Sequence, residues 1–286
     1  AGRVTAGKSR GSTEGAQIPT ATSQKWNRAW PVSQAALSPH NATRRSGSGS
    51  RSEPWTDRTH TGRPVGQTGP MEFDLDTVDA LLSTTRAVRK RLDLARDVPD
   101  GVVLECLRLA TQAPTGSNLQ GWRWLVVRDP ATKAALAELY RRGGGEYLAA
   151  AAETAQAGTQ TGRVFDSANY LAEHLHEVPV IVIPMIVGRA DGSVASAAGL
   201  FGSIIPAVWS FQLALRSRGL GSCYTTLHLA LEREAAALLD IPDHVTQVGL
   251  LPVAYTVGTG FRPAVRRPIE ELAFLDRYRQ PLAPPI

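Results

Sequence analysis

The sequence predicts an α+β domain in residues 71–286, because segments with the period of a helix alternate with short apolar runs typical of strands. The clearest strand is Val178–Val187, a nearly unbroken apolar run that suits a strand covered on both faces. The clearest helix is Ser196–Arg218, which is apolar almost all round and is followed by Gly219, a common helix terminator. Residues 1–70 show neither pattern.

Residues 1–70 are rich in Ser, Gly, Thr, Arg and Pro, and we expect them to form a disordered basic tail. They carry 10 Lys and Arg against 3 Asp and Glu, so the net charge of +5 comes from the tail and not from residues 71–286. The charge is diffuse, and nucleic-acid binding is therefore not expected. Two origins stay open: a native tail, or an extension upstream of a natural start at Met71.

The elements of residues 71–286 follow in order from their periodicity, caps and breakers. Asp76 and Asp100 each precede an apolar helical stripe, and Pro114 ends the second helix. We expect helices from 77 onward and at about 100–113, 131–140, 165–176, 196–218 and 232–239. We expect strands at 122–127, 178–187 and 245–255. Residues 141–162, which include three consecutive glycines, predict a mobile cover over a substrate.

The chain holds two cysteines, Cys106 and Cys223, and both lie among apolar residues, which indicates core packing. Their spacing suggests neither a disulfide framework nor a metal site. No run of 18 apolar residues predicts a membrane span, and no signal peptide is evident, so we expect a cytoplasmic protein. Glycine-rich dinucleotide, P-loop and nucleophile-elbow motifs are absent from the sequence.

A short polar loop, 113–121, joins the helix at 100–113 to the strand at 122–127. Gly116 would let the backbone take unusual angles and approach a ligand closely. The loop also supplies a hydroxyl and two side-chain amides, from Ser117, Asn118 and Gln120. Such groups can read the polar edge of a flat heterocycle, although an ordinary polar turn accounts for the loop when it is taken alone.

Four cations within six residues, Arg86, Arg89, Lys90 and Arg91, follow the first helix. Guanidinium groups bind phosphate through paired hydrogen bonds, so this turn is a candidate anion site. A solvated basic turn is the alternative.

The apolar helix at 196–218 is long for a chain of this size, and we expect a second subunit to cover part of it. This predicts an obligate homodimer with an interface above ~2,000 Å². A buried central helix of a monomer is the alternative.

Two of these motifs together resemble the nitroreductase family of FMN-dependent oxidoreductases. The family typically shows an Arg-Arg-Ser-x-Arg turn followed by an Ala-Pro-Ser-Gly-x-Asn-x-Gln-Pro-Trp loop; here the matching segments are 85–89 and 113–122. Thr85, Ala87 and Gly121 depart from that pattern, and the first two remove phosphate donors. The resemblance covers roughly 76–275 and implies a nitroreductase-like fold: a mixed central sheet flanked by helices, in a homodimer with FMN at the subunit interface.

The resemblance also implies site residues. The phosphate of FMN would lie on Arg86, Ala87, Arg89 and Arg266. The polar edge of the ring would face a loop that comes partly from the partner subunit, formed by Pro114, Thr115, Gly116, Ser117, Asn118 and Gln120. One face of the ring would lie under Tyr224, Thr225, Thr226 and Leu227. The chemistry takes place on FMN, so no catalytic side chain is assigned except, as a candidate, Thr226, whose hydroxyl would favour protonation of the flavin.

The implied activity passes electrons from NADH, NADPH or a deazaflavin to a small electrophilic acceptor by a ping-pong mechanism. Nitroaromatics, quinones and halogenated phenols are candidate acceptors. The alternatives are a non-enzymatic flavin-sequestering protein and a flavin-consuming or dehalogenase-like enzyme of the same fold; Thr225 and Thr226 match the dehalogenase-like members. The expected partners are the second subunit and the acceptor, with no membrane.

Overall fold

The computed structural model describes residues 72–154 and 158–282. The tail predicted at 1–70 and the start proposed at Met71 lie outside the described residues.

A five-stranded sheet forms the centre of the domain, in the order β1-β2-β5-β3, with β4 paired to β2 beside β5. The strands are β1 (Trp122–Val127), β2 (Val180–Val187), β3 (Leu220–Ser222), β4 (Val245–Gln247) and β5 (Leu251–Tyr255). The strand pairs among them are antiparallel, and parallel pairing within the described residues is confined to an isolated bridge between Ala87 and Ser222. The predicted α+β class is confirmed, but the described strands form an antiparallel sheet and not the mixed sheet that the resemblance implies.

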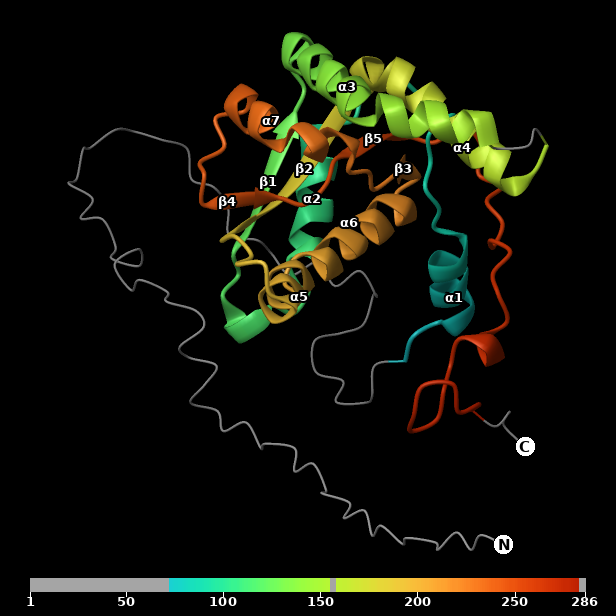
Figure 1. Cartoon of the computed structure of the whole chain (residues 1–286). Coiled ribbons are helices and arrows are strands. Elements are labelled where there is room, and N and C mark those ends of the chain that lie inside the picture. The colour runs from blue at the N-terminus through green and yellow to red at the C-terminus, as the bar shows by residue number, and fades with distance from the viewer. Residues whose placement is uncertain (1–71, 155–157, 283–286) are drawn as a thin grey trace, which may run out of the picture. The chain divides into compact units, whose positions relative to one another are not determined.

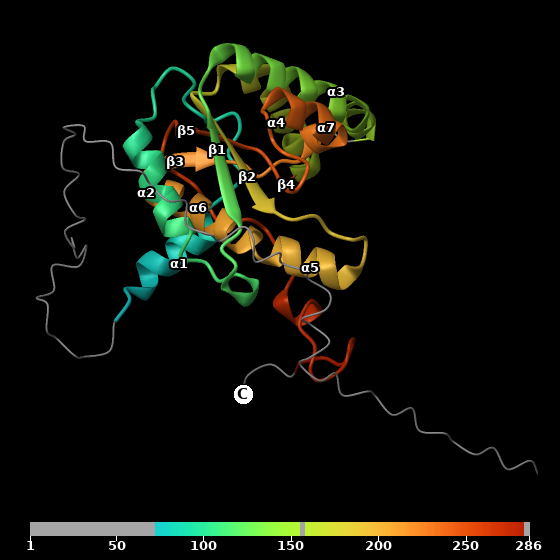
Figure 2. The same cartoon turned by 90° about the vertical axis from the view of Figure 1, so that its left-hand side faces the viewer.

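Helices cover both faces of this sheet (Figures 1 and 2). The α-helices are α1 (Leu75–Thr84), α2 (Asp100–Ala110), α3 (Pro130–Thr154), α4 (Gln160–His174), α5 (Val194–Gly202), α6 (Ile205–Ser217) and α7 (Glu232–Leu238). Short 3-10 turns are η3 (Gly116–Asn118), η4 (Leu175–Glu177), η5 (Leu227–Leu231) and η6 (Ile269–Glu271).

Strand β2 shows why two apolar layers form. Ile181 and Ile183 face the core shared with α3 and α4, whereas Val180 and Val182 face the core shared with α2 and α6. Successive side chains of a strand point to opposite faces, so a strand that is apolar at every position is buried on both sides. The central strand predicted from the apolar run is confirmed.

The mobile cover predicted at 141–162 is wrong for residues 141–154, which continue α3 without interruption from Pro130. Three glycines in a row are unfavourable inside a helix, by roughly 1 kcal/mol each relative to Ala. Close packing of α3 against η5 explains their presence, because two of the three glycines lie at that contact.

The single helix predicted at Ser196–Arg218 is instead two helices, α5 and α6, separated at Ser203 and Ile204. Pro206 stands at the start of α6, where its missing N–H has no intrahelical partner to lose. Gly219 ends α6 with φ +75°, as expected.

The stretch Val194–Ser217, which spans both helices, is long and apolar enough to cross a membrane by length and composition, and its mean hydropathy is 1.6. Only 28% of the most apolar 18 residues of this stretch are buried within one chain. This is less than expected for a helix that is buried on most sides, as the sequence predicts. A pair of helices whose exposed face is covered by another protein surface would show the same apolar composition.

The strand predicted at Val245–Tyr255 is interrupted between β4 and β5. Gly249 lies in the gap, and a Cβ atom there would come within 2.5 Å of the Tyr224 ring. The interruption therefore makes room for an aromatic side chain from the segment that follows β3.

Candidate functional site

A cationic cavity of about 430 Å³ lies where three parts of the chain meet. These are residues 86–91 after α1, called here the arginine turn, α4, and residues 260–263 after β5. It is lined by Arg86, Ala87, Val88, Arg89, Lys90, Arg91, Ser167, Gly260, Phe261, Arg262 and Pro263. Five of these side chains are cations, and none of the lining residues in the described chain is acidic. The cavity therefore suits an anion.

The backbone of the arginine turn is fixed by the edge of the sheet. Val88 donates its N–H to the carbonyl of Ser222 at 2.9 Å, and Val257 donates to the carbonyl of Arg91 at 2.8 Å. A Cβ atom at Gly221 would lie 2.9 Å from the Cβ of Val88, so the glycine permits this close approach. The turn is thus a rigid extension of the sheet, which holds its cations in place.

The five cations are not equally available to a ligand. Arg91 is committed to the protein, because it donates to the carbonyls of Val257 (2.8 Å) and Gly260 (3.2 Å) and stacks on the Phe261 ring. Lys90 pairs with the Asp166 carboxylate at 2.6 Å.

Arg86, Arg89 and Arg262 keep donors to spare. Arg86 gives one N–H to the carbonyl of Arg262 at 2.9 Å, and Arg89 makes a long contact of 3.4 Å with the hydroxyl of Ser167. A guanidinium carries five N–H donors, so most remain for a phosphate-sized anion.

The structure brings the predicted Arg86, Ala87 and Arg89 together but does not bring Arg266 to them. Arg266 is exposed, and its guanidinium contacts only the neighbouring carbonyl of Val265, at 3.5 Å, among the described residues. Arg262 takes the third position at the cavity and was missed by sequence reasoning. The signal was present, since Arg262 stands directly before Pro263 in the same segment.

The predicted loop 113–121 lies against α5 and does not line the cationic cavity. The N–H of Gly116 donates to the Ser203 hydroxyl at 3.0 Å, and the indole of Trp122 donates to the Ser203 carbonyl at 2.8 Å. Within one chain, the two halves of the predicted site are therefore separate.

The backbone strain expected at Gly116 occurs at the next residues instead. Ser117, Asn118 and Gln120 have φ of 51°, 52° and 49°, in the left-handed region that residues with a Cβ seldom adopt. Gly116 itself serves close approach, since a Cβ there would lie 3.1 Å from the Ser203 hydroxyl. Strain of this kind is concentrated at functional sites.

The predicted segment Tyr224–Leu227 leads from β3 into the first residue of η5. The Thr225 hydroxyl lies 2.9 Å from the hydroxyl of Tyr140 on α3. Tyr224 donates its hydroxyl to the carbonyl of Val248. Thr226 is exposed, and its hydroxyl has no hydrogen-bond partner within the described part of the chain.

The segment adjoins the cationic cavity through Arg89. Burial raises the pKa of Tyr140 to about 12, against the opposing effects of the Thr225 hydroxyl and the Arg89 charge. Burial likewise raises the pKa of the Cys223 thiol to about 11, again opposed by Arg89. Both groups are neutral at physiological pH, so neither places a negative charge beside Arg89.

Residues 72–154 and 158–282 contain no group of three or more His, Cys, Asp or Glu arranged to hold a metal ion.

Comparison with known proteins finds relatives in both sequence and fold. The sequence profile of the Nitroreductase family matches residues 82–255. An NADH dehydrogenase of Thermus thermophilus is 31% identical over 221 residues, which span 71% of this chain and 98% of that protein. The fold is similar to that of an iodotyrosine deiodinase bound to FMN and 3-iodo-L-tyrosine (TM-score 0.52, 23% identity, 71% of this chain and 99% of the other). It is equally similar to the FMN-dependent nitroreductase NfnB of Mycobacterium smegmatis in complex with NADPH (TM-score 0.52, 20% identity, 71% and 99%).

Proposed function

Because this chain belongs to the nitroreductase family, we propose that it is an FMN-dependent oxidoreductase that passes electrons from NADH or NADPH to a small electrophilic acceptor. The observation that carries the proposal is the cationic cavity, in which Arg86, Arg89 and Arg262 keep free donors around a space of about 430 Å³. A phosphate dianion matches that donor set in charge and geometry.

Bound FMN would supply a two-electron carrier that accepts hydride from the nicotinamide and then reduces the acceptor at the same place, in a ping-pong cycle. The arginines would hold the phosphate, and the rigid backbone of the turn would orient the attached ring. The exposed hydroxyl of Thr226 would be available as a proton donor, while the hydroxyl of Thr225 would be held by Tyr140.

We further propose that the active form is a homodimer. The loop 113–121, with its strained backbone, and the cationic cavity are separate on one chain, and a second copy would complete each site with the partner's loop. Apolar side chains on α5 and α6 support a covered face: Val194 is 86% and Trp209 43% exposed.

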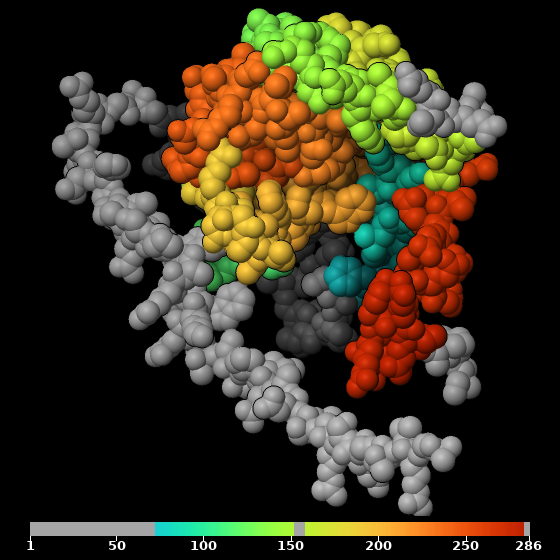
Figure 3. All heavy atoms as spheres, viewed as in Figure 1, coloured from blue at the N-terminus to red at the C-terminus, as the bar shows by residue number. Residues whose placement is uncertain are grey.

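The C-terminal segment, residues 260–282, also exposes large apolar side chains. In Figure 3 it stands out in red beside the teal α1, and Val265 and Tyr278 are 82% and 77% exposed. Exposed apolar side chains that form one contiguous patch are typical of surfaces that a partner covers.

The visible spectrum of the purified protein tests the cofactor, and steady-state NADPH oxidation with a nitroaromatic tests the activity. A yellow protein that oxidises NADPH only when an acceptor is present supports the proposal. Bound flavin without turnover for any donor would favour the sequestering alternative, and a colourless protein that refuses added FMN would refute both.

A halogenated phenol is the second candidate acceptor, favoured by the adjacent Thr225 and Thr226, of which only Thr226 presents a free hydroxyl among the described residues. Halide release from an iodophenol under reducing conditions, compared between the parent chain and Thr226→Val, tests this candidate.

A further inference from the structure

The turn formed by Thr225, Thr226 and Leu227 packs against α3. This helix packs along η5, which begins at Leu227, the last residue of the turn. Three of its residues, Tyr140, Gly143 and Gly144, meet the turn within little more than one helical turn of each other.

Tyr140 fixes the first threonine. The residue is 1% exposed, and its hydroxyl lies 2.9 Å from that of Thr225. A buried tyrosine hydroxyl needs a hydrogen-bond partner, and Thr225 supplies it. The backbone of Thr225 is also fixed, because it exchanges two hydrogen bonds with Leu250, of 3.1 and 2.8 Å.

The two glycines fix Leu227. A methyl group at Gly143 would overlap the carbonyl oxygen of Leu227, and one at Gly144 would lie 2.5 Å from its Cδ1 atom. By contrast, a methyl group at Gly145 would meet nothing within 4 Å. Of these three consecutive glycines, therefore, only the first two are required by the contact.

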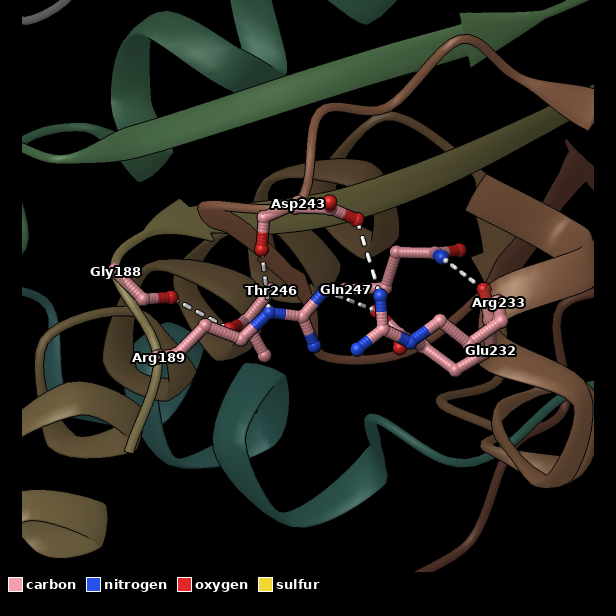
Figure 4. Close-up of polar contacts among 7 residues, drawn as sticks. All are labelled: Gly188, Arg189, Glu232, Arg233, Asp243, Thr246 and Gln247. Atoms are coloured by element: carbon pink, nitrogen blue, oxygen red, sulfur yellow. Dashed lines mark hydrogen bonds and ion pairs between the residues drawn. The ribbon is translucent and has the colours of Figure 1, made fainter. Parts of the chain in front are cut away.

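The far end of the same segment is fastened by a polar network, shown in Figure 4. Gln247 on β4 donates to the carbonyl of Glu232, where η5 passes into α7, at 3.2 Å. The Glu232 carboxylate in turn pairs with Arg189 at 2.9 Å. The segment from Thr225 to Glu232 is thus anchored at both ends, and Thr226 is the exposed residue at its start.

From this arrangement we infer that α3 positions the ligand-facing turn, with Tyr140 and Gly143 as its positioning residues and Thr226 as the residue they present. The inference rests on the proposed function, because it assigns the turn to the flavin site. Tyr140 withdraws the Thr225 hydroxyl from the ligand, and Gly143 sets how closely the turn approaches α3. Neither residue needs to touch the ligand.

The matched pair Gly143→Ala and Gly145→Ala tests the packing half of the inference. Both variants add one methyl group to the same helix, and only the first meets the turn. We expect Gly143→Ala to weaken FMN binding at least tenfold and to speed amide exchange at Leu229, whose N–H bonds the Thr226 carbonyl at 2.9 Å. Gly145→Ala should change neither. Equal FMN affinity and equal exchange in the two variants would overturn the assignment.

Tyr140→Phe tests the positioning half and removes one hydroxyl without changing the packed ring. We expect a folded protein that still binds FMN but shows altered visible circular dichroism of the bound flavin and a shifted midpoint potential. Thr225→Val removes the same hydrogen bond from the other side and should reproduce both changes. Thr225→Ser retains the hydroxyl and should leave the circular dichroism and the midpoint potential as in the parent chain. A role in stability alone would lower the melting temperature and leave both flavin signals unchanged.

These measurements test the proposed FMN binding and the positioning role of α3 separately. If the parent chain does not bind FMN, the proposed function fails and amide exchange still reports on the anchoring of the turn by α3. If the parent chain binds FMN and Tyr140→Phe leaves its spectrum and potential unchanged, the positioning role is wrong and the proposed function stands.

Discussion

The guanidinium of Arg86 donates to the carbonyl of Arg262 at 2.9 Å, across 176 positions of the chain. This one hydrogen bond joins the turn after α1 to the segment after β5, the two pieces that enclose the cationic cavity. Arg86 therefore has two tasks: it closes the cavity wall and keeps further donors for an anion.

Removing a guanidinium from the cavity should weaken FMN binding. We expect Arg86→Ala and Arg89→Ala each to cost about 1.5–3 kcal/mol, the scale of hydrogen bonds to charged groups, which is roughly a ten- to hundredfold rise in Kd. Fluorescence titration of FMN measures it. Arg267→Ala is the control, because Arg267 pairs with Glu271 at 2.8 Å outside the cavity. An unchanged Kd in both cavity variants would place the phosphate elsewhere.

The third arginine can be identified by a direct comparison. From the geometry we expect Arg262→Ala to weaken FMN binding more than Arg266→Ala, because Arg262 lines the cavity and Arg266 does not. The same titration decides between them. A larger effect at Arg266 would mean that the segment after Pro263 moves onto the phosphate when FMN binds.

A charged residue on the apolar face of α6 should dissociate the dimer. We expect the parent protein to have a mass near 61 kDa in light scattering, twice the 30.6 kDa of one chain, and Trp209→Glu to shift it toward one chain. The reason is the cost of burying an unpaired charge in an interface. Leu238→Glu on α7 is the control. A parent protein that is monomeric at micromolar concentration contradicts the proposed dimer.

Acid should destabilise the protein through His228. Burial lowers the pKa of this fully buried histidine from 6.5 to about 4, against opposing effects of Gln247 and Glu232. Between these two pKa values the unfolded chain binds the proton and the folded chain does not, so the free energy of unfolding falls as the pH drops from about 6.5 to 4. The contribution is about 3 kcal/mol, at 1.36 kcal/mol per pKa unit.

Urea unfolding at a series of pH values measures this effect. His228→Gln should flatten the dependence over that window, while His176→Gln, at an exposed position, should leave it as in the parent chain. The same slope in the His228 variant and the parent would assign the acid sensitivity to other groups.

The two thiols should be unreactive until the protein unfolds. Cys106 and Cys223 have no exposed surface, and burial raises the pKa of each to about 11. The thiolate is the reactive form, and both its fraction and its access are then very small. Titration with an aromatic disulfide reagent should detect two thiols in denaturant and essentially none without it. Rapid modification of the native protein would show that one of these sites opens.

Local sequence patterns predicted β1, β2 and two of the cations at the cavity, but not β3 or the break between β4 and β5. The strands β1 and β2 follow from apolar runs, and Arg86 and Arg89 follow from their density of charge within one turn. In each case the pattern that carries the prediction lies within about ten consecutive residues, so it can be recognised without knowing the contacts with distant parts of the chain.

Two of the features that were missed depend on distant contacts. The glycines of α3 resemble a flexible linker until η5, more than 80 residues later, is placed against them. Arg262 becomes a site residue only when its segment reaches the arginine turn. The break before α6 was visible in Pro206, but the continuous apolar pattern outweighed it.

The contact between Gly144 and Leu227 also limits how this chain can evolve. Because the Cδ1 atom of Leu227 occupies the space that a side chain at position 144 would need, the two positions share one volume. A side chain at 144 therefore requires Leu227 either to turn to another rotamer or to be replaced by a smaller residue.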